Sequence, residues 1–179
     1  PEKGVSTLLE AWRSLKDVPL KVAGDGPLSE KARAMMSREK LENVELLGQR
    51  SHDEVVTLMK GAHFLVFPSE WYEGFPMTLV EALACGVPIV ASRLGAMAEI
   101  VEERHTGLLF QPGDSADLAD KVRWAMDHPD TMRQMGVKAR RIYEEKYTAE
   151  RNYETLSDVY ERAVEKAKHG RQLHDAAGS

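Results

Sequence analysis

The stretch FPSEWYEGFPMTLVEALACGVPIVA, from Phe67 to Ala91, places a loop, a helix and a strand in succession. Its middle part, Pro76 to Ala84, is apolar on almost every side, and a helix of that kind is buried. Val87 to Ala91 is a short apolar run that begins after a glycine and contains a proline, which is typical of a strand covered on both faces. The stretch therefore predicts a loop that leads into a buried helix and a parallel strand.

The same alternation continues on both sides of this stretch. Other short apolar runs are Leu20 to Ala23, Val44 to Leu47, Phe64 to Phe67 and Leu108 to Phe110. Helical spacing lies between them, in Leu28 to Leu41, Asp53 to Ala62, Ala96 to Glu103 and Ala116 to Met126. Strands and helices that alternate along the chain imply parallel strands joined by right-handed crossovers. We expect an α/β fold with a doubly wound, Rossmann-like parallel sheet and, from Pro129 onward, two C-terminal helices separated near Tyr147.

The first residues carry a helical stripe without a preceding strand. Apolar side chains recur at Val5, Leu8, Leu9, Trp12 and Leu15, which is the spacing of a helix that faces a core. A sheet of this type opens with a strand, so we expect a fragment that lacks its first strand. Residues 1–168 are then one domain and residues 169–179 a frayed tail.

Composition narrows the class of protein. The 179 residues carry a formal charge of -5 and one cysteine, Cys85, so no disulfide framework is possible and a reducing, cytoplasmic location is expected. The acidic balance argues against nucleic acid as a partner. The basic run Lys138, Arg140, Arg141 and Lys146 has two interpretations, a solvated helix face or a peripheral membrane contact.

Glu81 is the polar residue that most needs an explanation. It stands among Leu79, Val80, Ala82, Leu83 and Ala84 on the expected buried helix. A carboxylate carried inward is costly unless a partner hydrogen-bonds it. An internal salt bridge to Arg93 or Lys121, or a solvent-facing position, would satisfy it. The functional alternative is a pair of ligand hydroxyls, such as a ribose diol.

The loop before that helix has the features of an anion site. Ligands in open α/β sheets settle beyond the carboxyl ends of the strands, which is where Glu73 and Gly74 lie. The free amides at the helix start, those of Met77, Thr78 and Leu79, together with the helix dipole, favour a phosphate. Trp71 in this loop has two interpretations, a ligand contact or an ordinary exposed residue.

This ordered set of motifs resembles the retaining nucleotide-sugar glycosyltransferases of the GT-B fold, in their largest family, the group 1 enzymes. The resemblance covers roughly residues 1 to 165. It rests on Lys3-Gly4, Gly24-Asp25-Gly26-Pro27, Val44 to Gly48, Glu73-Gly74-Phe75-Pro76, Glu81-Ala82, Gly86-Val87-Pro88 and Gly107-Leu108-Leu109. It implies the C-terminal, donor-binding domain of such an enzyme.

The resemblance also implies roles for single residues. Glu81 would hold the ribose hydroxyls, Glu73 would bind hydroxyls of the donor sugar, Lys3 would neutralise the diphosphate and Arg50 would border the base. Glu73 and Lys3 are the catalytic residues expected. The further substrate-binding residues are Gly74, Phe75, Pro76, Met77, Thr78 and Gly26.

The function expected from this resemblance is the binding of a nucleotide-diphosphate sugar for retaining hexosyl transfer, without a metal or any cofactor beyond that co-substrate. The partner expected is an N-terminal acceptor-binding domain, without which the isolated chain would be inactive. The alternative is a non-catalytic nucleotide-sugar binding module or assembly subunit. A phosphosugar isomerase or epimerase of similar fold is a third interpretation. The six histidines show no metal-ligand spacing, and Gly24 to Pro27 lacks the third glycine of a dinucleotide fingerprint.

Overall fold

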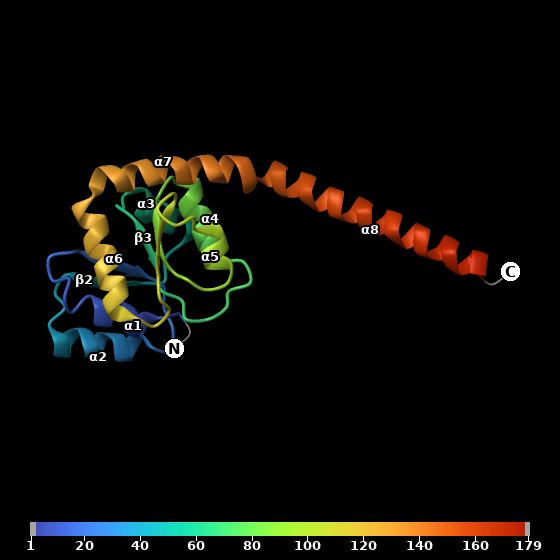
Figure 1. Ribbon diagram of the computed structural model, residues 1–179. Helices are drawn as coiled ribbons and strands as arrows, with labels where there is room; N and C mark the ends of the chain where they lie inside the picture. The colour runs from blue at the N-terminus through green and yellow to red at the C-terminus, as the bar shows by residue number, and fades with distance from the viewer. Residues whose placement is uncertain (1–2, 178–179) are drawn as a thin grey trace. The chain divides into compact units, whose positions relative to one another are not determined.

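The computed structural model describes residues 3–177, which form two compact units. The first unit runs to Arg141 and the second begins at Ile142. The elements, drawn in Figure 1, are α1 Val5–Ala11, β1 Leu20–Ala23, α2 Ser29–Glu39, β2 Val44–Gly48, α3 His52–Lys60, β3 Leu65–Phe67, α4 Met77–Ala84, β4 Ile89–Ser92, α5 Ala96–Ile100, β5 Gly107–Phe110, α6 Ser115–Asp127, α7 Pro129–Lys146 and α8 Ala149–Ala177.

All strand pairs among the named strands are parallel, which confirms the predicted α/β class. The strands pair in two groups instead of one continuous sheet, with β1 beside β2 and with β4 between β3 and β5. Strands β1 and β3 therefore each stand at the edge of their group. The additional first strand expected before Gly4 stays a prediction.

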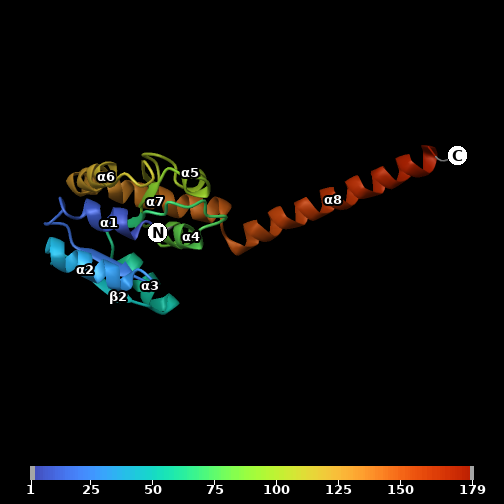
Figure 2. The same ribbon diagram turned by 90° about the horizontal axis from the view of Figure 1, so that it is seen from below.

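Helices cover both sides of the strands in the first unit. Figure 2 shows α5 and α6 along one side and α2 and α3 along the other. Strand β4 is buried on both faces: Val90 packs in the core cluster with residues of α1 and α6, whereas Ile89 and Ala91 are buried outside that cluster. This alternation follows from the two-residue period of a strand.

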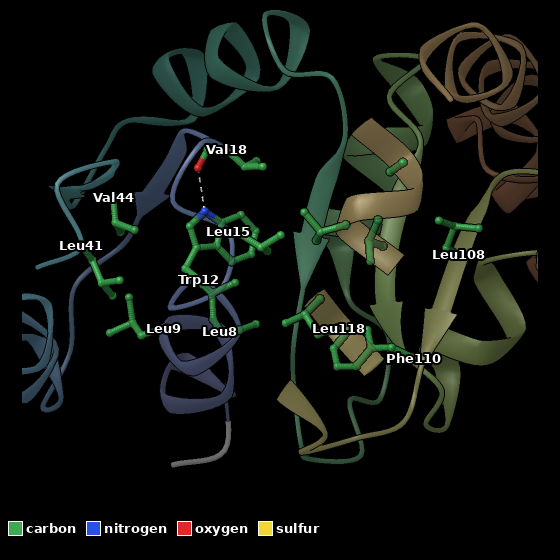
Figure 3. Close-up of a cluster of buried hydrophobic side chains, with 14 of the residues drawn as sticks. Leu8, Leu9, Trp12, Leu15, Val18, Leu41, Val44, Leu108, Phe110 and Leu118 are labelled. Carbon is green, nitrogen blue, oxygen red and sulfur yellow. Dashed lines mark hydrogen bonds between the residues drawn. The ribbon is translucent and has the colours of Figure 1, made fainter. Parts of the chain in front are cut away.

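Helix α1 provides the centre of the main core. Its apolar stripe continues past its end to Trp12 and Leu15, both fully buried as the stripe predicts. Figure 3 shows Trp12 between Val44 on one side and Phe110 on the other. The Trp12 indole nitrogen donates to the Val18 carbonyl oxygen at 2.9 Å, so its polar atom is satisfied within the apolar cluster.

Several helices begin one residue away from the predicted start. Helix α3 begins at His52, one residue before the expected Asp53, with Ser51 as its cap and Glu54 completing a reciprocal capping box. Pro76 was expected at the first helical position but takes the cap position, with α4 beginning at Met77. Helix α6 begins at Ser115, capped by the side chain of Asp114.

The C-terminal part contains the two predicted helices. They are separated at Tyr147 and Thr148, because α7 ends at Lys146 and α8 begins at Ala149. Helix α8 continues to Ala177, so most of the tail that we expected to fray, residues 169–179, is helical, and its last two residues lie outside the described part. No helix among the described residues is long and apolar enough to span a membrane.

Candidate functional site

Parallel pairing brings the loops that follow β1, β2 and β3 to the carboxyl ends of the strands. The ends of β1 and β2 are joined, because the Gly24 amide donates to the Gly48 carbonyl oxygen at 2.8 Å. The loop from Pro68 to Pro76 follows β3 and leads into α4. Most of the residues that the sequence singled out lie in these loops, at the edge where open α/β sheets bind ligands.

Lys3, which precedes α1, forms a cluster with Ser69 and Glu73 of the loop after β3. The Lys3 ammonium lies 2.5 Å from Glu73 Oε1 and donates to it. The Ser69 hydroxyl donates to the same oxygen at 2.9 Å. The Glu73 side chain is 18% exposed and that of Lys3 is 69% exposed. The cluster therefore joins a partly shielded carboxylate to a cation that faces solvent.

The charge of Glu73 is stabilised where it stands. The hydrogen bond from Lys3, with a smaller contribution from Ser69, holds the pKa of Glu73 below its usual value, although partial burial opposes the shift. The carboxylate is thus ionised at neutral pH. It can accept hydrogen bonds from hydroxyl groups but cannot donate a proton there.

The start of α1 is fixed against the loop after β3. Gly4 has φ of 66°, and a Cβ atom at this position would lie 1.8 Å from the Pro68 carbonyl oxygen. Only glycine fits such a conformation and such a contact. Three residues further on, the Thr7 hydroxyl donates to a Glu70 carboxylate oxygen at 2.5 Å. These two contacts hold Lys3 next to Glu73.

The start of α4 offers two amides, fewer than we expected. The Leu79 amide donates to the Pro76 carbonyl oxygen at 3.0 Å, so it is not free to bind a phosphate. Among the described residues, none of the hydrogen bonds outside the helices and strands uses the amides of Met77 and Thr78. The side chains of Phe75 and Met77 are exposed beside them.

Glu81 differs from the prediction in its burial and in its partner. Its side chain is 28% exposed, so it is not the inward carboxylate that its apolar neighbours suggested. Neither Arg93 nor Lys121 pairs with it, because they pair with Glu103 and Asp117 respectively. Its neighbour is His52, whose Nδ1 lies 3.6 Å from Glu81 Oε1. Helix α3 therefore begins beside α4.

Arg50 borders a hollow along α3. The hollow has a volume of about 470 Å³ and is lined by Arg50, Leu47, Asp53, Glu54, Thr57 and Leu58. It is open to solvent and lies next to the loop that leads to His52. Its walls offer both charged groups and apolar surface.

Gly26 makes a local turn instead of presenting a free amide. Its amide donates to Asp25 Oδ1 at 2.8 Å and to Ser29 Oγ at 3.1 Å. The structure thus places Gly26 in the loop after β1, with its amide already in use and no other atom within 4 Å of the position that a Cβ atom would take.

The sequence did not indicate Ser69, His52 or the pair of Thr7 and Glu70. Ser69 lies four residues before Glu73, and a serine near a glutamate is too common to be a signal. His52 and Glu81 come from different helices, so no local spacing relates them. The contact between Thr7 and Glu70 likewise joins residues that are far apart in the chain.

Comparison with known proteins gives a family match. The family model described as glycosyl transferases group 1 matches residues 1–142. An uncharacterized glycosyltransferase of Methanocaldococcus jannaschii is 34% identical over 161 residues, which are 90% of this chain and 45% of that protein. A D-rhamnosyltransferase of Pseudomonas aeruginosa is 31% identical over 149 residues, which are 82% of this chain and 39% of that protein.

A solved structure extends the match to the fold. The crystal structure of the Anabaena protein HepE in complex with UDP and glucose has a TM-score of 0.79 and 27% identity, over 88% of this chain and 45% of HepE. The chain spans less than half the length of each of these three proteins.

Proposed function

This chain belongs to the group 1 glycosyl transferases, and we propose that it is the donor-binding domain of a retaining hexosyltransferase. The sequence resemblance to the C-terminal domain of a GT-B enzyme of this group is confirmed by the family and fold matches. The bound donor is a nucleotide-diphosphate sugar. A structural relative whose crystal structure is in complex with UDP and glucose supports this class of ligand.

The cluster of Lys3, Ser69 and Glu73 at the approach to α4 carries the proposal. Both contacts to Glu73 use Oε1, which leaves Oε2 for hydroxyl groups of the donor sugar. Lys3 is mostly exposed and can turn toward the diphosphate. The amides of Met77 and Thr78 add two donors at a helix start, where anions are favoured.

In transfer, the bond between the anomeric carbon and the diphosphate oxygen breaks, and the diphosphate leaves with the electron pair. The oxygen of an acceptor hydroxyl then bonds to that carbon on the same face and passes its proton to the departing diphosphate oxygen, which gives retention. Lys3 and the α4 amides would stabilise the charge that grows on the diphosphate, the kind of interaction that lowers a barrier most. No metal is required in this scheme.

Glu81 and Arg50 form the nucleoside end of the proposed site. Glu81 is partly exposed beside His52, so its oxygens can accept from the two ribose hydroxyls. Arg50 lines the open hollow along α3, which would receive the base. The acceptor would be bound by an N-terminal domain, and the cytoplasm is the proposed location.

The experiment compares the affinity for UDP, GDP and ADP with that for UDP-glucose, GDP-mannose and ADP-glucose by isothermal titration calorimetry. Glu81→Ala should lower the affinity for the bare diphosphate and for its sugar nucleotide alike, by about tenfold or more, because two hydrogen bonds to a charged group are lost. Glu73→Ala should lower the affinity for the sugar nucleotide far more than the affinity for the bare diphosphate.

A matched control is Glu30→Ala, which removes an exposed carboxylate from the first turn of α2. It should change neither affinity. Equal losses for both ligands in the Glu73 variant would contradict the sugar-binding role, and an unaltered Glu81 variant would contradict the ribose-binding role.

A further inference from the structure

Glu73 has two hydrogen-bond donors of different character on one oxygen. Lys3 is a flexible, mostly exposed cation from the start of the chain, 70 residues away in sequence. Ser69 belongs to the same loop as Glu73 and is 1% exposed. Only one of the two donors is therefore built into the loop.

We propose that Ser69 is a positioning residue that holds the Glu73 carboxylate toward the donor sugar while Lys3 exchanges from Glu73 to the diphosphate. This inference rests on the proposed function. It adds a residue that the family resemblance did not single out, and it assigns Lys3 two successive partners.

The exchange follows from charge. A diphosphate carries more negative charge than one carboxylate, so it competes for the single ammonium of Lys3 once it reaches the start of α4. Glu73 then loses its strongest partner at the moment when it must hold the sugar. An ammonium drawn toward the diphosphate holds Glu73 less firmly, whereas Ser69 bears no charge and has no reason to move.

The surroundings of Ser69 fix its hydroxyl. Its oxygen lies 3.4 Å from the Trp71 amide nitrogen, which donates to it. That bond closes a small turn between the end of β3 and Glu73. The Trp71 carbonyl oxygen is a second acceptor for this hydroxyl, but it lies at 3.5 Å, farther away than Glu73 Oε1 at 2.9 Å. Because burial also removes competing water, the Ser69 hydroxyl remains directed at Glu73 Oε1 when the ammonium leaves.

The test measures the ratio of the affinity for a sugar nucleotide to the affinity for the matching bare diphosphate. Three ligand pairs are tried: UDP-glucose with UDP, GDP-mannose with GDP, and ADP-glucose with ADP. The variants are then measured with the pair that the wild type binds. Ser69→Ala should reduce the preference for the sugar nucleotide by about tenfold, because a hydrogen bond to a charged group is lost. The affinity for the bare diphosphate should stay within about twofold. Ser69→Thr keeps a hydroxyl and should restore most of the preference.

A matched control separates positioning from packing. Ser92 is also fully buried, but its hydroxyl has no hydrogen-bond partner in the described residues, so Ser92→Ala removes a buried hydroxyl without a bond to Glu73. It should leave the ratio unchanged. An unchanged ratio in Ser69→Ala, or equal losses for both ligands, would overturn the inference and leave the donor site intact. A wild type that binds none of the six ligands would overturn the proposed function, and the inference with it.

A second readout does not depend on affinity at neutral pH. The Ser69 hydrogen bond is one of the contacts that lower the pKa of Glu73, so its loss should raise that pKa. The pH below which the sugar nucleotide loses its advantage should therefore be higher in Ser69→Ala than in the wild type and in Ser92→Ala. The same pH in all three proteins would also overturn the inference.

Discussion

Gly4 is the residue on which the place of Lys3 depends. Its φ of 66° and its contact with the Pro68 carbonyl oxygen exclude a side chain. We expect Gly4→Ala to lower the free energy of unfolding by about 1 to 2 kcal/mol from the left-handed backbone alone, and further through the contact. Urea unfolding followed by circular dichroism measures this change.

Gly74 provides the control for that substitution. Its φ is not among the positive values found for other glycines, and no other atom lies within 4 Å of the position that a Cβ atom would take. Gly74→Ala should leave the unfolding free energy nearly unchanged. If both variants lost the same unfolding free energy, the loss in Gly4→Ala would not come from the positive φ of Gly4 or from its contact with Pro68.

Which residues gather at the site could be predicted only in part. The resemblance singles out Glu73 and Lys3, and the structure brings these two side chains together, while their roles stay a prediction. The burial of Glu81 was overestimated, because apolar neighbours on a helix do not show which way one residue on it faces. Its neighbour His52 could not be predicted, since the contact depends on how two helices pack.

At the scale of elements, the capping box at the start of α3 fixes His52, the first residue of that helix, and the preceding loop with Arg50. The Ser51 side chain accepts from the Glu54 amide, and the Glu54 carboxylate accepts from the Ser51 amide. We expect Ser51→Ala to cost about 1 kcal/mol of unfolding free energy. Chemical denaturation detects a change of this size.

The control is Ser37→Ala, an exposed serine inside α2. Alanine is the better helix former, so this substitution should cause no loss. Equal destabilisation by the two substitutions would mean that the cap contributes nothing.

A second prediction at this scale concerns the ion pair between Asp17, which follows α1, and Arg123 of α6. The two guanidinium nitrogens of Arg123 donate to the two Asp17 oxygens at 2.7 and 2.8 Å. This contact lowers the pKa of Asp17 from 3.8 to about 2. A lowered carboxylate pKa stabilises the folded state above the unfolded value, and that stabilisation is lost as the pH falls through the folded value.

The wild type should therefore exceed Asp17→Asn in stability by a constant amount above about pH 4, and the difference should vanish toward about pH 2. Both partners are exposed, so added salt should shrink the difference. Urea unfolding of both proteins over this pH range tests the prediction. Curves that stay a constant distance apart down to about pH 2 would contradict it.

The elements themselves were largely predictable from the sequence. Short apolar runs such as Leu20–Ala23 and Val44–Gly48 became strands because they are bounded by loops and pack on neighbouring helices. Helix ends were predicted less closely: α5 ends at Ile100 instead of near Glu103. The side chain of Glu103 binds Arg93 and the Leu109 amide, contacts that a local pattern does not contain.

At the scale of the whole molecule, the division of the strands into two groups could not be predicted. The alternation of strands and helices indicates parallel pairing but not which strands are neighbours. Strands β1 and β3 each lie at the edge of their group. The additional first strand expected from the sequence would pair with an edge strand such as these. The family match over residues 1–142 fits the first unit, which runs to Arg141.

The claim of a donor site is tested most directly by thermal unfolding of this chain with UDP, GDP and ADP, each with and without an attached hexose, in the presence and absence of EDTA. A ligand at about a hundred times its dissociation constant adds roughly 2.7 kcal/mol, or about 5 to 10 °C for a chain of this size. We predict such a shift for one nucleotide and its hexose conjugate, unchanged by EDTA. No shift with any of the six ligands would contradict the account.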